Sequence, residues 1–248
     1  MRTLAILLIC LFWSSALSGQ RLDTVANRVT TIGLEYGIQW PGGDLSDRFG
    51  QHFTLGTSLQ WTSLRQPYFL GAFGYFQFGT QVREDVLEPF RTTDGGIINP
   101  AQEFVQVYLR QRGFQTGIEG GINLRKSAGR GLWILEPGLQ AGWLSHHIRI
   151  QDESVSLPYL QKPYRAAYDR LSSGPALGGI IHVLYLQHQK LVNVRMDLYV
   201  TRAFTRLRRT IQNDAPGITE IRRDWIYGVR LAWMIPVYGG IAVEDIYY

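Results

Sequence analysis

The chain has 248 residues, of which 18% are charged and 12% are aromatic, and its formal net charge is +5. So few charged residues argue against the surface of an ordinary water-soluble protein. The only cysteine, Cys10, lies in an N-terminal apolar stretch, so the mature chain is expected to have no disulfide, thiolate metal site or catalytic thiol. The 27 glycines and the aromatic content together indicate β structure.

The N-terminus has the pattern of an export signal. A short basic start is followed by the apolar run Leu4 to Trp13 and by small residues that end at Ser18. This pattern predicts a signal peptide over residues 1–18 and a mature domain over 19–248. Lipidation of Cys10 is the competing interpretation, but Ile9 is a poor residue before a lipidated cysteine. No run of 18 apolar residues follows, so no transmembrane helix is expected.

Eight segments have strand-like composition and alternation. They are residues 29–40, 52–62, 68–78, 103–124, 132–150, 175–187, 191–205 and 224–235. Short connections alternate with long ones, which is typical of tight periplasmic turns and long outer loops. We predict a single-domain, all-β, antiparallel up-and-down transmembrane β-barrel of about eight strands. Segment 103–124 is either one strand or a hairpin, and the last strand ends at Ile235 or at Tyr248.

The first strand poses the question of which face points outward. In TIGLEYGIQW, residues 31–40, apolar side chains alternate with Gly33, Glu35, Gly37 and Gln39. Across the strands the polar face combines glycine with Gln, Glu and Arg, which suits a tight lumen. The apolar face carries six tryptophans near strand ends, in an outer girdle (Trp40, Trp143, Trp225) and a periplasmic girdle (Trp61, Trp133, Trp233). Trp133 and Trp143 on one strand span roughly 25 Å at about 40° tilt, the height of an outer-membrane apolar band. The alternative is a soluble, lipocalin-like barrel with the aromatic residues inside.

The polar face predicts a network of charges inside the barrel, called the lumen network below. Its members are Glu35, Glu119, Glu136, Arg195, Asp197 and Arg230. These charges form either a proton or ion path or a structural plug. The plug is favoured because eight strands leave an interior that side chains just fill, so a general porin is not expected.

Several segments also resemble known outer-membrane proteins. The stretches GDLSDRFG, AAYDRL, RRDWIYGVRLAWMIPVYGG and the terminal DIYY resemble a group of uncharacterised Gram-negative barrel proteins, within the eight-stranded architecture of OmpA and OmpX. The aromatic end resembles the C-terminal signal that the barrel-assembly machinery reads, although Pro236 and Gly239 interrupt the stretch before it. The resemblance implies a fold and a bacterial outer-membrane location, and it implies no activity. GDLSDRFG also predicts a short helical turn that begins with Asp44 as its N-cap.

No motif for a phosphate loop, a dinucleotide, a metal or a nucleophile elbow is present, so we expect no cofactor, no metal site and no enzyme activity. One alternative is a lipid A acyl hydrolase that uses Ser145 and His147 at the outer rim. Asp152 or Glu153 would then orient the histidine.

A second cluster at the outer rim is basic. Its members are Arg206, Arg208, Arg209, Arg222 and Arg223. Arginine favours bidentate contact with phosphate, which predicts binding to lipopolysaccharide; a solvated basic loop is the alternative. The expected partners are outer-membrane lipid and lipopolysaccharide, and nucleic acid is not expected. The chain is predicted to be a structural or surface-interaction barrel, or else an accessory subunit of a larger outer-membrane secretion or assembly complex. Thr116 and Gly120 on an outward face favour the subunit.

Overall fold

The computed structural model describes most of the predicted mature domain. The described residues are 28–63, 66–128, 131–152, 157–161, 165, 168–187, 193–209 and 221–237. The predicted signal peptide, Glu153, most of the segment 206–223 and the terminal Tyr248 lie outside these ranges. Among the described residues, no helix is long and apolar enough to cross a membrane.

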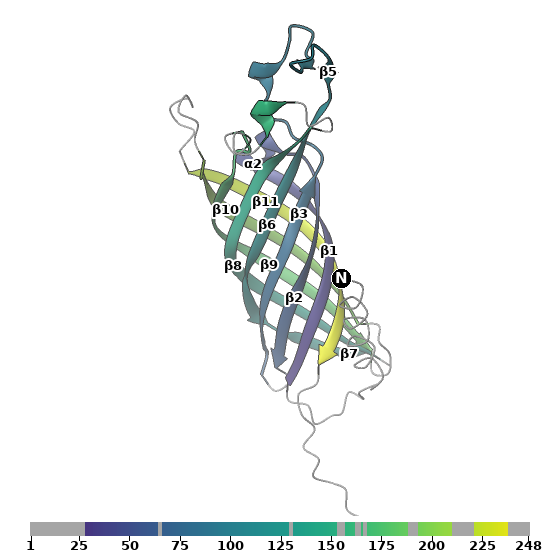
Figure 1. The fold of residues 1–248 in the computed structure, drawn as a ribbon. Helices are drawn as coiled ribbons and strands as arrows, with labels where there is room; N and C mark the ends of the chain where they lie inside the picture. The colour runs from purple at the N-terminus through teal and green to yellow at the C-terminus, as the bar shows by residue number, and fades with distance from the viewer. Residues whose placement is uncertain are drawn as a thin grey trace, which may run out of the picture.

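Antiparallel strands form a closed ring (Figure 1). They are β1 (Arg28–Gly43), β2 (His52–Ser63), β3 (Tyr68–Gly79), β6 (Val107–Ile122), β7 (Leu124–Ala128), β8 (Gly131–Asp152), β9 (Ser172–Gln187), β10 (Val194–Leu207) and β11 (Arg222–Val237). β1 pairs with β11 from Thr30 opposite Val237 to Gly43 opposite Asp224, and β6 pairs with β8, so the described sheet has no free edge. β6 and β7 both pair with β8 and are separated only by Asn123, so they form one of eight barrel strands. The predicted fold class is confirmed.

The structure resolves one of the two points that the sequence left open. Segment 103–124 is not a hairpin within the barrel; its first residues form β5 (Phe104–Val105), which pairs with β4 (Ile97–Ile98) in the outer loop. The last strand is described as far as Val237, and Tyr248, the other predicted end, lies outside the described residues.

The outer end of the barrel carries short helices. They are α2 (Asp44–Arg48), η1 (Glu88–Phe90) and η2 (Pro158–Leu160). The prediction that Asp44 caps the first of these was wrong, because Gly43 is the N-cap residue and has φ +57°, a conformation that favours glycine. Asp44 instead accepts a hydrogen bond from the backbone N–H of Arg223 at 2.7 Å, which ties the helix to β11.

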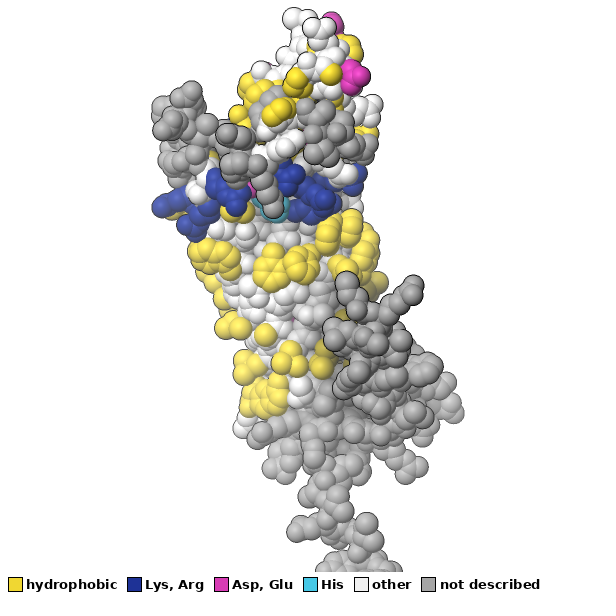
Figure 2. All heavy atoms as spheres, in the orientation of Figure 1, with side chains coloured by type: hydrophobic (Ala, Val, Ile, Leu, Met, Phe, Trp, Pro, Cys, Tyr) yellow, Lys and Arg dark blue, Asp and Glu magenta, His cyan; other side chains and the backbone are white. Residues whose placement is uncertain are grey.

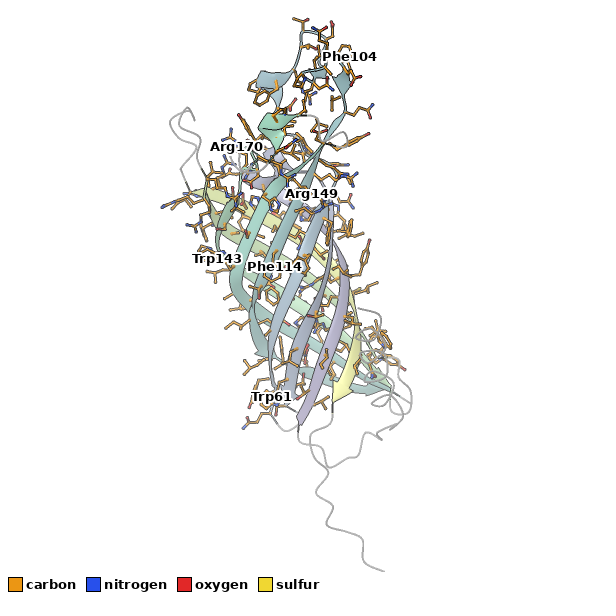
Figure 3. The ribbon with its side chains drawn as sticks, in the orientation of Figure 1. Trp61, Phe104, Phe114, Trp143, Arg149 and Arg170 are labelled. Carbon is orange, nitrogen blue, oxygen red and sulfur yellow. The ribbon has the colours of Figure 1, made fainter. Side chains whose placement is uncertain are left out.

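The apolar face of the strands points outward. Along β1, Ile32, Leu34 and Tyr36 are exposed while Glu35 is only 2% exposed. Apolar side chains gather in two bands on the outside of the barrel (Figure 2). Trp143 lies near the outer end and Trp61 near the opposite end (Figure 3). A polar interior with an apolar exterior is the pattern of transmembrane barrels, and it excludes the lipocalin-like alternative.

The outer half of the interior is filled by an apolar cluster, called the outer plug below. Its buried members include Leu144, Ile148 and Ile150 from β8, Leu45 and Phe49 near α2, and Leu87, Ile97, Leu157 and Leu160 from the outer loops. Phe90 and Tyr168 meet edge to face against it, with ring centroids 5.3 Å apart. The loops at residues 79–102 and 151–174 therefore pack together over the end of the barrel.

Candidate functional site

Arg195 is the centre of the lumen network. It projects inward from β10 and is completely buried. Its guanidinium forms an ion pair with Glu35 of β1 and lies 2.8 Å from Oδ1 of Asp197, and Nη1 donates to Oε1 of Gln60 at 2.7 Å. The Arg195 side chain thus links three strands, β1, β2 and β10.

Arg230 of β11 also belongs to the lumen network and contacts aromatic rings as well as carboxylates. Its Nη1 is 3.2 Å from Oε2 of Glu35, and its Nε is 3.5 Å from Oδ2 of Asp197. The guanidinium carbon lies 4.5 Å from the ring centroid of Tyr199 and 4.9 Å from that of Tyr75. Cation–π contacts of this kind compensate a buried charge where hydrogen-bond acceptors are few.

The two remaining carboxylates join the network through residues that the sequence analysis missed. His182 of β9 lies 2.7 Å from Oδ1 of Asp197 and 3.5 Å from Oε1 of Glu119. Glu136 accepts a hydrogen bond from Nε2 of Gln60 at 2.5 Å. Alternation along β9 was the available signal, because His182 lies between the outward-facing residues 181 and 183.

The lumen network therefore closes the barrel cross-section. All six predicted members are at most 3% exposed, and they come from β1, β6, β8, β10 and β11. Isolated buried charges would be costly. Here Arg195 and Arg230 face Glu35 and Asp197, while Glu136 accepts hydrogen bonds from the neutral side chains of Gln60 and Thr62. The arrangement favours a structural plug over a path for ions.

A second group of polar side chains holds the outer loops to the barrel. Arg48 of α2 lies 2.6 Å from the carboxylate of Glu84 and donates to Oγ of Ser172 at 3.2 Å. Burial lowers the pKa of the Arg48 guanidinium, and the charge of Glu84 opposes this shift. Below them, Asp224 accepts a hydrogen bond from the Thr205 hydroxyl at 2.5 Å. The Arg48 contacts hold α2 against Glu84 of the outer loop and the first residue of β9, and the Asp224 contact joins β10 to β11.

The five predicted rim arginines do not all lie on one face of the barrel wall. Arg206, Arg208 and Arg223 are exposed, while Arg222 lies on the inward parity of β11 and repels the buried Arg48. Arg209 is ion-paired with Asp169. Arg208 donates to Oγ of Ser173 at 2.8 Å and lies over the ring of Trp143. Two of the five are thus engaged by the protein itself.

Ser145 and His147 face outward on β8, as their parity with Trp143 predicts. Both line a shallow groove with Phe76 and Phe114. Among the described residues no hydrogen bond joins the two side chains, and the carboxylate of Asp152 accepts the backbone N–H of Leu157 at 3.2 Å. Glu153, the other acid predicted to orient the histidine, lies outside the described residues.

Comparison with known proteins adds an architectural likeness. No family model and no curated protein matches the sequence. Eight solved chains match the structure, among them Neisserial surface protein A, with a TM-score of 0.39 and 7% sequence identity over 82% of this chain and 96% of that chain.

Proposed function

We propose that the chain is an integral protein of the bacterial outer membrane: a sealed, non-enzymatic β-barrel that acts as a structural or surface-interaction protein. The observation that carries this proposal is the inverted distribution of side chains. Large apolar residues such as Leu139 (74% exposed) face outward, while the charged Arg195 is fully buried. Only a lipid environment stabilises that arrangement.

The interaction surface is proposed to be the outer loops. The β4–β5 hairpin stands at the tip of the molecule, far from the barrel wall (Figure 3). Its residues Phe104 and Ile98 are 72% and 41% exposed. Exposed apolar side chains on a loop that is held by a packed base are typical of protein contact sites.

The test is reconstitution. The mature chain is refolded into lipid vesicles that contain a trapped dye and a salt gradient, with a general porin as the positive control. We expect heat-dependent gel mobility, which reports a folded barrel, and ion and dye release no faster than from empty vesicles. Folded protein that conducts ions would contradict the sealed lumen, and failure to insert would contradict the membrane location.

A second candidate function, an accessory subunit of a larger outer-membrane complex, is favoured by one patch of the barrel wall. Thr116 and Gly120 face outward on β6; Gly74 of β3 lies opposite Thr116, and Gly179 of β9 lies level with Gly120 on the other side of Leu139. Small residues allow close approach of another membrane segment.

Gentle detergent extraction, native sizing and mass spectrometry test the second candidate. A Cβ at Gly179 would meet no atom within 4 Å, so Gly179→Leu is expected to fold and to release a partner bound at this wall. Thr57→Leu, which is exposed on β2, is the matched control and is expected to retain the partner. Wild-type protein that runs alone would contradict the subunit function.

A further inference from the structure

A second basic cluster, different from the one that the sequence predicted, lies on the outer ends of β6 and β8. Arg110 pairs directly with Arg149 across the two strands, and Arg112 pairs with His147. All four side chains are on the outward parity. Arg149 is exposed and labelled in Figure 3, where it lies at the outer end of the barrel wall. Arg110, Arg112 and Arg149 are called the β6–β8 arginine cluster below.

This cluster has an electrostatic cost that the described part of the chain does not offset. Like charges directly opposite one another on neighbouring strands are destabilising, and Arg112 is repelled by both Arg149 and Arg110. Among the described residues, none of the three forms an ion pair with a carboxylate. The nearby Asp169 is already paired with Arg209. The cluster is therefore complementary to an external anion.

An apolar groove lies directly beneath the cluster on the membrane side. It has a volume of about 260 Å³, and its lining includes Phe76 and Phe78 of β3, Phe114 of β6 and Ser145 of β8. Arg112 forms its outer edge, with the guanidinium carbon 5.2 Å from the Phe78 ring centroid. The groove is therefore apolar inside and has a cationic side chain at its outer edge.

The position of this site matches the boundary of the membrane. The groove lies at the level of the outward-facing pair Phe114 and Ser145. The next outward-facing pair toward the membrane is Thr116 and Trp143, and Trp143 belongs to the outer girdle. The next outward-facing pair away from the membrane is Arg112 and His147, where the outward face becomes basic. Figure 2 shows dark blue side chains in a belt just above the upper apolar band. A bound lipid would thus have its headgroup at the arginines and an acyl chain against the phenylalanines.

We propose that the outer ends of β3, β6 and β8 bind a phosphorylated, acylated glycolipid, the lipid A part of lipopolysaccharide. A phosphate group accepts charge-assisted hydrogen bonds from Arg112 and Arg149, Arg110 adds a third cation, and one acyl chain occupies the groove. Three guanidinium groups suit a phosphate monoester, which carries up to two negative charges, better than the single charge of a glycerophospholipid diester. The inference rests on the proposed function, because only outer-membrane embedding presents this lipid to the site.

Native mass spectrometry of the refolded mature chain tests the proposal, with diphosphoryl lipid A, its dephosphorylated form and phosphatidylglycerol as probes. We expect wild-type protein to bind diphosphoryl lipid A most tightly. The variant Arg112→Gln/Arg149→Gln is expected to lose about tenfold or more in affinity, since it removes two charge-assisted contacts. The matched control is Arg206→Gln/Arg223→Gln, which removes two exposed rim charges on β10 and β11 and is expected to retain affinity.

A third variant tests the groove. Ser145→Phe fills the apolar slot without changing any charge and is expected to weaken lipid A binding, whereas the controls keep it. Equal, small losses of lipid A affinity in the two double-arginine variants would mean that lipid A contacts the basic residues without a specific site, and would contradict the proposal. Folded wild-type barrel that binds the three lipids equally would overturn the inference while leaving the proposed function intact. Failure of the chain to insert into vesicles would overturn both.

Discussion

The two halves of the barrel interior are filled in opposite ways. The half toward the periplasm contains the lumen network, in which Arg195 and Arg230 pair with Glu35 of β1 and Asp197 of β10. The outer half is closed by the outer plug, where Leu144, Ile148 and Ile150 pack with loop residues. Both fillings are buried, yet one depends on pairing of charges and the other on close packing.

On β8 the difference follows the membrane boundary. Within the membrane, β8 turns Leu135 and Leu139 outward and Glu136 and Gln140 inward. Beyond Trp143 the faces exchange their chemistry, so that His147 and Arg149 face out while Leu144 and Ile148 face in. Where lipid surrounds the wall, apolar residues belong outside; where water surrounds it, the ordinary inside-apolar rule returns.

Breaking the lumen network should give the largest effect. Arg195→Met leaves Glu35 and Asp197 without their main partner, and removal of one member of a buried ion pair costs about 3–5 kcal/mol. Urea unfolding of the vesicle-refolded barrel, followed by tryptophan fluorescence, measures the loss. Arg206→Met removes an exposed arginine from the same strand and should change the free energy of unfolding by less than about 0.5 kcal/mol. Equal effects would contradict a structural network.

Breaking the outer plug should cost somewhat less. Leu144 is completely buried, so Leu144→Ala loses transfer free energy and leaves a cavity, for a total of about 3 kcal/mol. Leu139→Ala on the same strand makes the same chemical change on the lipid face, where acyl chains fill the space. The difference in free energy of unfolding between Leu144→Ala and Leu139→Ala measures the cost of the cavity. Equal losses would mean that the outer half of the barrel is loosely packed.

Crowding of the middle of the lumen should have a smaller effect. A Cβ at Gly228 would lie 2.2 Å from Cζ of the Tyr199 ring, and Tyr199 accepts a hydrogen bond from Gln39 at 2.7 Å. Gly228→Ala must displace this ring, at a cost of about 2 kcal/mol. Gly179→Ala meets open space and should stay within about 0.5 kcal/mol of wild type in the same unfolding measurement. If Gly228→Ala leaves the free energy of unfolding unchanged, the interior is not close-packed at this level.

The strands and their faces could be predicted from the sequence because alternation is a local signal. Glu35, Arg195 and Asp197 were placed in one interior by parity alone, and the structure pairs them. Parity also placed Ser145 and His147 outward. The same rule, applied to β6 and β8 beyond the girdle, would have found Arg110, Arg112 and Arg149.

The outer plug could not be predicted in this way. Leu87, Ile97 and Leu157 come from outer loops that alternation does not describe, and they belong to the same buried cluster as Leu144. The basic rim was predicted from adjacency in the sequence, which placed Arg222 with Arg223, although neighbouring residues on a strand point to opposite faces. Contacts between loops distant in sequence depend on the complete fold.

The smallest effect is expected where a charge pair lies in water rather than inside the barrel. In the outer loop, Nε of Arg91 lies 2.5 Å from Oδ2 of Asp85, and the two side chains are 34% and 40% exposed. A double-mutant cycle with Arg91→Gln and Asp85→Asn should give a coupling below about 0.5 kcal/mol, because solvent screens exposed pairs. The matched cycle on Arg48 and Glu84, at 2.6 Å with Arg48 only 5% exposed, should give a larger value in the same unfolding assay. If the two couplings are equal, burial is not what separates the ion pairs of the interior from those of the rim.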